Sequence, residues 1–99
     1  MSKPVIWSPS SEKDFISILN YLKMNWGIPV ERNFIDISEK LVIQISNNPR
    51  QFPLIQRKKK VRKCVITKHN TLFYRDKQKY IEIIRIYDTR QDPNQLKLF

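Results

Sequence analysis

Histidine and arginine, two side-chain types that act on phosphate groups, occur together in the second half of this sequence. His69 is the only histidine among the 99 residues, and histidine is the side-chain type that ordinarily exchanges a proton near neutral pH. Arg62 and Arg90 precede and follow it in the chain. A guanidinium holds phosphate oxygens through two parallel hydrogen bonds and stays charged at any working pH. His69 is therefore the candidate acid or base, arginines such as Arg62 and Arg90 could bind an anion, and Asp88 could orient His69 or pair with Arg90.

Basic charge is concentrated around Arg62. Residues 1–49 contain five basic and five acidic residues, whereas residues 50–68 contain eight basic residues and no acidic one. The formal net charge of +10 is therefore mostly one block, which favours a nucleic acid or an acidic protein as the partner. A solvated surface is the plainer interpretation of such a run. The candidate binding residues are the basic side chains of this block and of the strands after it: Arg57, Lys58, Lys59, Lys60, Lys63, Lys68, Arg75 and Arg85.

The composition limits the class of protein. Ninety-nine residues, 40% of them hydrophobic, suffice for one domain over residues 1–99 with a small core. A lone cysteine, Cys64, cannot form an intramolecular disulfide and reads as a small buried residue in a reducing compartment. The sequence shows no signal-peptide pattern and no apolar run of about 20 residues, so we expect a cytoplasmic protein without membrane contact. One histidine, one cysteine and one glycine supply neither a zinc site nor a glycine-rich phosphate loop, so we expect no metal and no cofactor.

The first quarter of the chain predicts a strand followed by a helix. Val5-Ile6-Trp7 is β-branched and aromatic, and Pro9 stops it, which predicts a strand over about residues 4–8. Ser11-Glu12-Lys13-Asp14 fits a capping box with Ser11 as the cap. Apolar residues then recur at intervals of three and four, which predicts a helix over about residues 11–25.

A second helix follows closely. Gly27, the only glycine, suits the left-handed position after a helix, and Pro29 suits the first turn of the next one. Apolar residues recur at helical intervals until Asn47-Asn48-Pro49 ends the pattern. A gap of about four residues between the helices predicts an antiparallel helical hairpin.

The rest of the chain predicts a sheet. Residues 51–56 read as a loop or a short irregular crossing. Three strands are expected over about residues 60–68, 71–76 and 80–88, joined by polar turns. Hairpin-linked strands give an antiparallel meander that can cover the apolar side of the helices. The expected fold class is therefore α+β in the order β-α-α-β-β-β, a helical hairpin packed on a small antiparallel sheet.

This order of elements and several short segments resemble the RelE/ParE superfamily of type II toxins. The resemblance spans nearly the whole chain and rests on Trp26-Gly27, Asn48-Pro49, Val61-Arg62, Leu72-Phe73-Tyr74-Arg75 and the run from Ile83 to Pro93. It implies a bacterial toxin that a cognate antitoxin holds inactive. Within the superfamily, RelE-like members cut mRNA in the ribosomal A site, and ParE-like members poison DNA gyrase.

The resemblance also implies roles for particular residues. RelE-like nucleases carry basic residues on the strand that corresponds to 60–68, an arginine early in the next strand, another late in the last strand, and in some members a C-terminal tyrosine. Arg62 and Arg90 match the first and third positions. Thr71 stands at the second, where Arg75 or Lys68 would have to substitute, and no tyrosine follows Tyr87.

For metal-free RNA cleavage, the 2′-hydroxyl attacks the neighbouring phosphate, and the site must move two protons and neutralise the phosphorane. Arg62, His69 and Arg90 are the expected catalytic residues, the arginines for charge and His69 as acid or base. Plainer interpretations are a turn residue for His69 and a structural ion pair of Arg90 with Asp88. Arg85 would point to the open sheet face or pair with an acid such as Glu82 or Asp88.

Three functions follow from this sequence. We expect a toxin that cleaves mRNA on the ribosome. The alternative, favoured by Trp26-Gly27, is a non-enzymatic ParE-like poison of DNA gyrase. A further alternative is a basic nucleic-acid-binding module in which Tyr74, Tyr80 and Tyr87 stack on bases. Either toxin is expected to bind an antitoxin that lays a helix or extended segment over the hairpin and the basic sheet face.

Overall fold

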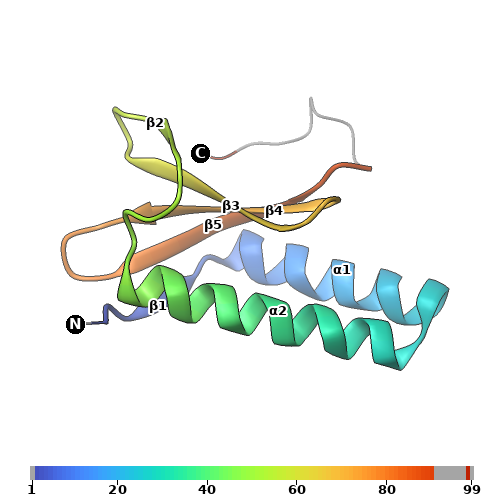
Figure 1. Cartoon of the computed structure of the whole chain (residues 1–99). Coiled ribbons are helices and arrows are strands. Elements are labelled where there is room, and N and C mark those ends of the chain that lie inside the picture. The colour runs from blue at the N-terminus through green and yellow to red at the C-terminus, as the bar shows by residue number, and fades with distance from the viewer. Residues whose placement is uncertain (1, 91–97, 99) are drawn as a thin grey trace.

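Two helices pack on one face of a five-stranded sheet in the computed structural model, which describes residues 2–90 and 98 (Figure 1). The α+β class and the predicted helices and long strands are confirmed. In chain order the elements are β1 (Val5–Trp7), α1 (Pro9–Trp26), α2 (Ile28–Asn47), β2 (Leu54–Gln56), β3 (Val61–Thr67), β4 (Asn70–Asp76) and β5 (Ile81–Asp88).

The sheet is mixed rather than purely antiparallel. Its strand order is β1-β5-β4-β3-β2, and β3, β4 and β5 form the predicted meander. The expectation that all strands are antiparallel was wrong for β1, which pairs parallel with β5 so that Val5 lies opposite Ile81. This pairing joins the two ends of the chain, and alternation within a short strand carries no information about its neighbour.

The segment predicted as a loop over residues 51–56 contains a short edge strand. β2 pairs antiparallel with β3, with Leu54 opposite Arg62 and Gln56 opposite Val61. All three residues of β2 are exposed, so no alternation of apolar and polar side chains marks them as a strand. Pairing with β3 produces this strand.

Helix α1 begins earlier than the sequence predicts. Ser8, not Ser11, is the N-cap, and Pro9 occupies the first turn. The Ser8 hydroxyl accepts the Ser11 N–H at 3.0 Å and donates to the Ile84 carbonyl at 2.7 Å. Ser11 is fully buried, and its hydroxyl donates to the Ser8 carbonyl. The start of α1 is thereby tied to β5, a contact that a local capping pattern cannot reveal.

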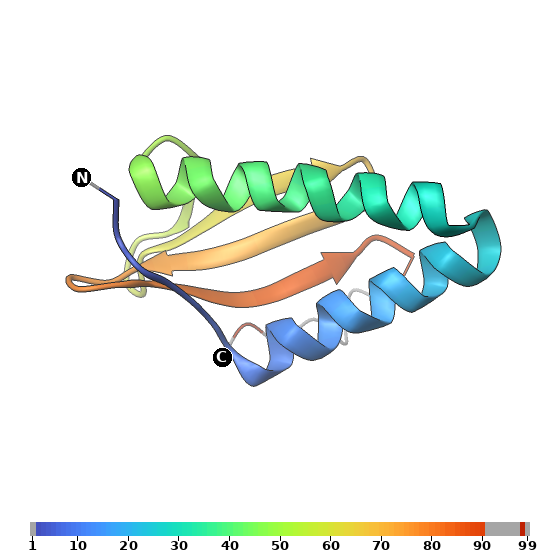
Figure 2. The ribbon, with the colours of Figure 1, turned by 90° about the horizontal axis from the view of Figure 1, so that it is seen from below.

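Gly27 alone connects the two helices, so the predicted gap of about four residues was too long. Its φ of +94° lies in the left-handed half of backbone space, as expected, and its N–H donates to the carbonyls of Leu22 and Lys23. The helices meet at Gly27 and diverge toward their other ends (Figure 2).

The core lies between the helices and the sheet. Ile18, Phe34 and Ile45 of the helices pack there on residues of the long strands, including Leu72 and Ile83. A second, smaller cluster comprises Val61, Phe73 and Ile84, with Tyr87 and Leu98 beside it. Among residues 2–90 and 98, no helix is both long and apolar enough to cross a membrane.

Cys64 is fully buried in the larger core cluster. Burial raises the pKa of its thiol to about 11, because a thiolate loses its hydration there. A neutral, inaccessible thiol fits the expected role of a small buried residue.

Candidate functional site: two hollows at opposite ends of the sheet

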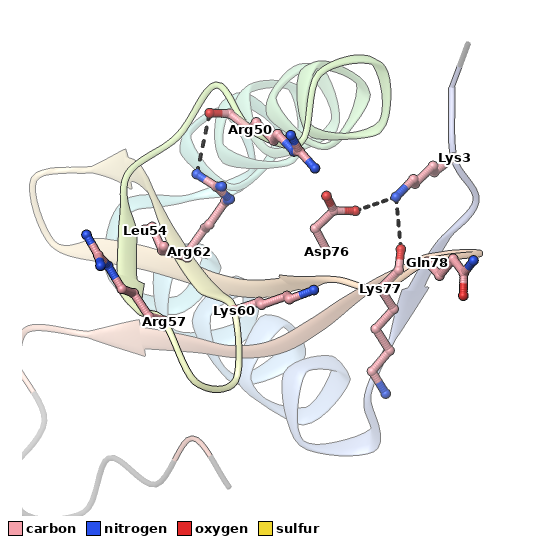
Figure 3. A pocket seen from close by; sticks show the side chains of 9 residues that line it. All are labelled: Lys3, Arg50, Leu54, Arg57, Lys60, Arg62, Asp76, Lys77 and Gln78. Carbon is pink, nitrogen blue, oxygen red and sulfur yellow. Dashed lines mark hydrogen bonds and ion pairs between the residues drawn. The ribbon is translucent and has the colours of Figure 1, made fainter.

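One hollow of the surface is lined almost entirely by polar and charged residues. We name it the basic hollow; its volume is about 650 Å³. Its walls come from four separate parts of the chain: the N-terminus, the segment after α2, the β2–β3 hairpin and the turn after β4 (Figure 3). The lining residues are Lys3, Arg50, Leu54, Arg57, Lys60, Arg62, Asp76, Lys77 and Gln78.

Arg62 is held in place at the inner wall of the basic hollow. One of its guanidinium nitrogens, Nη1, donates to the Phe52 carbonyl at 2.7 Å and to the Arg50 carbonyl at 3.4 Å. Both acceptors lie in the segment that follows α2, so β3 and this segment are fixed together. The charge of Arg62 therefore has a defined position before any ligand arrives.

Lys3 closes the opposite wall. Its ammonium donates to Asp76 Oδ1 at 2.6 Å and to the Lys77 carbonyl at 2.9 Å (Figure 3). These contacts span more than 70 residues of sequence. They place the N-terminal segment against the turn that follows β4. Among the described residues of the lining, Asp76 is the only acidic one.

The turn that joins β2 to β3 carries four consecutive basic residues, Arg57 to Lys60. Lys60 N donates to the Arg57 carbonyl at 3.2 Å, and Arg75 Nε donates to the Lys59 carbonyl at 3.0 Å. Lys60 has a φ of +56°, which glycine adopts far more readily than a side-chain-bearing residue. A second hollow of about 300 Å³, the satellite hollow, lies against this turn and is lined by Lys58, Lys59, Lys60, Arg75, Asp76, Lys77 and Gln78.

The other end of the structure carries a hollow of different chemistry. We name it the hairpin hollow; its volume is about 360 Å³, and it lies where the helices approach the turn between β3 and β4. Apolar side chains from both helices meet polar and basic ones from that turn. The lining residues are Leu22, Trp26, Val30, Asn33, Phe34, Ile37, Thr67, Lys68, His69, Asn70 and Arg90.

Arg90 is held by two partners at the rim of the hairpin hollow. Its guanidinium forms a two-pronged ion pair with Asp88, at 2.8 Å and 2.6 Å, and lies over the Tyr21 ring, 4.0 Å from its centre. Burial acts to raise the pKa of Asp88, but the hydrogen bonds and charge of Arg90 outweigh it and hold that pKa below its ordinary value. The pair with Asp88 also raises the pKa of Arg90. Of the two roles considered for Asp88 from the sequence, orienting His69 or pairing with Arg90, the structure shows the pair with Arg90.

His69 is exposed in the turn between β3 and β4. Its Nδ1 lies 3.4 Å from the Thr89 hydroxyl, and its carbonyl accepts the Thr89 N–H at 2.7 Å. The ring is thus close to the last residues of the described sheet and to Arg90.

The three predicted catalytic residues are divided between the two hollows. His69 and Arg90 both line the hairpin hollow, whereas Arg62 lines the basic hollow. Arg62 and His69 are seven residues apart along β3 and its turn, which at about 3.3 Å per residue separates their backbones by roughly 20 Å. The structure therefore brings His69 and Arg90 together and leaves Arg62 at the far end of the sheet; what each does chemically stays a prediction.

The predicted binding residues are likewise distributed. Lys68 lines the hairpin hollow, and Lys63 is exposed on β3. Arg85 pairs with Asp14 of α1 at 2.7 Å, whereas the acidic partners suggested by the sequence were Glu82 and Asp88. The remaining candidates line the basic or satellite hollow: Arg57, Lys58, Lys59, Lys60 and Arg75.

Sequence reasoning missed several residues of the basic hollow. Lys3, Asp76, Lys77 and Gln78 carried no local signal, because only the fold brings the N-terminus to the turn after β4. Arg50 was counted in the basic block but was not singled out. In the described residues, 2–90 and 98, no group of three or more His, Cys, Asp or Glu side chains could hold a metal ion.

The fold and the comparisons identify the class of protein. A helical hairpin on a five-stranded mixed sheet, in the chain order β-α-α-β-β-β-β, matches the fold of the RelE/ParE superfamily of toxins. More particularly, a model of the ParE toxin of the type II toxin–antitoxin system parDE matches residues 5–93. The chain belongs to this family, which implies a cognate antitoxin as partner.

Solved structures share the fold at low sequence identity. One belongs to the chromosomal ParDE system of P. aeruginosa, with a TM-score of 0.74 and 17% identity over 88% of this chain and 96% of that one. A YoeB dimer from Staphylococcus aureus gives 0.63 and 14% over 88% and 97%. A YoeB/ParE toxin from Agrobacterium tumefaciens gives 0.61 and 13% over 86% and 96%. No curated protein sequence matches significantly.

Proposed function

We propose that this chain arrests bacterial growth by binding DNA gyrase, without catalysis, and that its antitoxin relieves the arrest. One observation carries the choice between gyrase and mRNA as the target: Arg62 lines one hollow, and His69 and Arg90 line another. Membership of the ParE family supports the same choice.

RNA cleavage by this set of residues would need all three around one phosphate. An acid or base must lie within about 3 Å, or one water, of the proton it moves, and a misplacement of 1 Å already lowers the rate strongly. The backbones of Arg62 and His69 are roughly 20 Å apart along an extended strand. Both arginines are also already bonded within the protein: Arg62 donates to main-chain carbonyls, and Arg90 forms an ion pair with Asp88.

Ribosome-dependent mRNA cleavage is the second candidate. The hairpin hollow favours it, because this hollow gathers Lys68, His69 and Arg90 around one space. In that case the hairpin hollow would be the active site, and Arg62 would act elsewhere. The plain nucleic-acid-binding module is less well supported, because Tyr74 is fully buried and its hydroxyl donates to the Pro49 carbonyl.

The cognate antitoxin is expected on the helical side of the hairpin hollow. Trp26 is 66% exposed, and Val30 beside it is also exposed, so an amphipathic segment would find apolar contacts there. Lys68 and Arg90 at the rim would meet acidic side chains of the same segment.

The test is induction of the chain in a bacterial host, with pulse labelling of DNA and protein over the first minutes. The unmodified chain and His69→Gln are compared, with Lys13→Gln as an exposed control on α1. We expect DNA synthesis to fail first with a DNA-damage response, and all three chains to be equally toxic. Early collapse of translation with mRNA cut inside codons, abolished by His69→Gln alone, would select mRNA cleavage instead.

A further inference from the structure

We propose that the basic hollow and the satellite hollow together hold successive phosphates of a nucleic-acid strand. This deepens the proposed function, because it gives the toxin a direct contact with DNA in addition to gyrase. It rests on that function only for its biological setting. The binding itself is a property of the purified chain and is tested without gyrase.

The two hollows gather most of the net charge of the protein. Nine basic residues line them: Lys3, Arg50, Arg57, Lys58, Lys59, Lys60, Arg62, Arg75 and Lys77. Among residues 2–90 and 98, two carboxylates offset them, Asp76 beside Lys3 at 2.6 Å and Glu82 at 3.5 Å from Lys77 and 4.0 Å from Arg75. Within this described part of the chain the excess is seven positive charges, compared with a formal +10 for the whole chain. Duplex DNA carries one phosphate per about 1.7 Å of axis, so several could be neutralised here.

The cations are positioned in advance. Two main-chain carbonyls hold the Arg62 guanidinium, and Arg75 holds the turn through the Lys59 carbonyl. Lys60 keeps a left-handed backbone, with φ of +56°, where glycine would be easier. Side chains at such backbone positions are often found at functional sites. The Lys60 side chain lines both hollows, so its charge contributes to each of them.

The chemistry of the lining favours phosphate over a protein surface. The buried centre of a protein interface is rich in aromatic and apolar side chains. Among the described residues that line the two hollows, Leu54 is the one apolar residue. The hairpin hollow, by contrast, has Leu22, Trp26, Val30, Phe34 and Ile37 in its lining. A polar cavity with an excess of cations fits a ligand whose contacts are nearly all charge-assisted hydrogen bonds.

The experiment measures fluorescence anisotropy of a labelled 20-base-pair DNA duplex and of a single-stranded RNA with the same sequence, titrated with the full chain. The hollow variant is Arg57→Gln/Lys58→Gln/Lys60→Gln. The control variant is Lys13→Gln/Lys23→Gln/Lys40→Gln, which removes the same charge from exposed positions on the helices. Circular dichroism melts verify that each variant is folded.

For the unmodified chain we expect log K to fall with log[salt] at a slope of −4 or steeper, because each phosphate contributes about −0.9. For each phosphate contact that its three residues make, the hollow variant should have a slope shallower by about 0.9 and an affinity about eightfold lower at 0.1 M salt. The control variant should keep the slope. A slope shallower than about −2 for the unmodified chain, or equal losses in both variants, would overturn the proposal. So would a hollow variant that binds nucleic acid normally but loses antitoxin, since the hollow would then serve an acidic protein.

The outcome is separable from that of the proposed function. A chain that binds DNA through the hollow but stops translation first would refute the gyrase proposal and leave this one intact. A chain that stops DNA synthesis first, but whose hollow makes no salt-dependent contribution to duplex binding, would support the gyrase proposal and refute this one.

Discussion

Replacing Asp14 by alanine should strongly destabilise the fold, because this carboxylate joins α1 to β5 through several bonds at once. Asp14 Oδ2 accepts Arg85 Nε at 2.7 Å and the Ile86 N–H at 3.0 Å, and Oδ1 accepts Arg85 Nη2 at 3.0 Å. The Ile86 amide lies beside an irregularity in the pairing of β4 with β5. Asp14 therefore satisfies both a charge and a main-chain donor.

The expected cost is about 3 kcal/mol. Removing one partner of a buried pair costs about 3–5 kcal/mol, because the other charge is left without compensation. The side chains of Arg85 and Asp14 are 22% and 13% exposed, so water can reach part of the guanidinium, and the lower end of the range applies. For a domain of this size, 1 kcal/mol corresponds to about 4–8 °C in melting temperature, which gives a fall of roughly 12–24 °C.

Urea denaturation of the full chain measures this cost, with Glu12→Ala as the matched control. Glu12 is an exposed carboxylate in the first turn of the same helix, so its loss should cost well under 1 kcal/mol. The Asp14→Ala/Arg85→Leu double variant completes a mutant cycle, in which Asp14→Ala should cost less when Arg85 is absent. A loss below about 1 kcal/mol for Asp14→Ala, or the same loss with and without Arg85, would refute the reasoning.

Four further predictions concern single sites. The pKa of Asp88 is lower in the folded than in the unfolded chain, so the pair with Arg90 stabilises the fold above the ordinary carboxyl pKa and is lost as the pH falls below about 4; Asp88→Asn should flatten the acid side of a plot of melting temperature against pH. Gly27→Ala should cost about 1–3 kcal/mol in urea denaturation, because φ is +94° and ψ 174°, although the nearest atom that a Cβ would meet is 3.7 Å away. Lys60→Gly should raise stability by about 0.5–1 kcal/mol by relieving its backbone while weakening DNA binding, two opposite readouts from one substitution. The Cys64 thiol should react with a disulfide reagent only as fast as the protein unfolds, because it is fully buried and its pKa is about 11.

Short-range sequence patterns were enough to predict the helices and the three long strands, because interactions between neighbouring residues determine these elements. The helices followed from apolar spacing and from the proline and glycine at their ends, and the three long strands from alternation between polar turns. Ser8 replaced Ser11 as the cap because its hydroxyl also bonds Ile84 on β5, which is a tertiary contact. β2 was missed because its exposed residues show no pattern and only the pairing with β3 defines it.

The candidate site depended on contacts between distant segments and could be predicted only in part. The basic block was visible in the sequence, but its concave shape requires Lys3 to reach Asp76 across the chain. Arg62 and His69 were assigned to one site because of the resemblance to RelE-like nucleases and because their side chains suit phosphate chemistry, and they belong to one predicted strand and its turn. A strand is long, however, and places residues at its two ends at opposite ends of the sheet.

That separation bears on how an antitoxin could neutralise this chain. β3 is the element that connects the two hollows, with Arg62 near its start and Lys68 after its end. A partner confined to the hairpin hollow would leave the cations of the basic hollow open, and a partner confined to the basic hollow would leave Trp26 exposed. Covering both requires a segment that spans roughly 20 Å, about six residues in extended form. If the proposed contact with DNA contributes to toxicity, an antitoxin fragment that binds only at the hairpin end should leave the salt-dependent affinity for DNA in place.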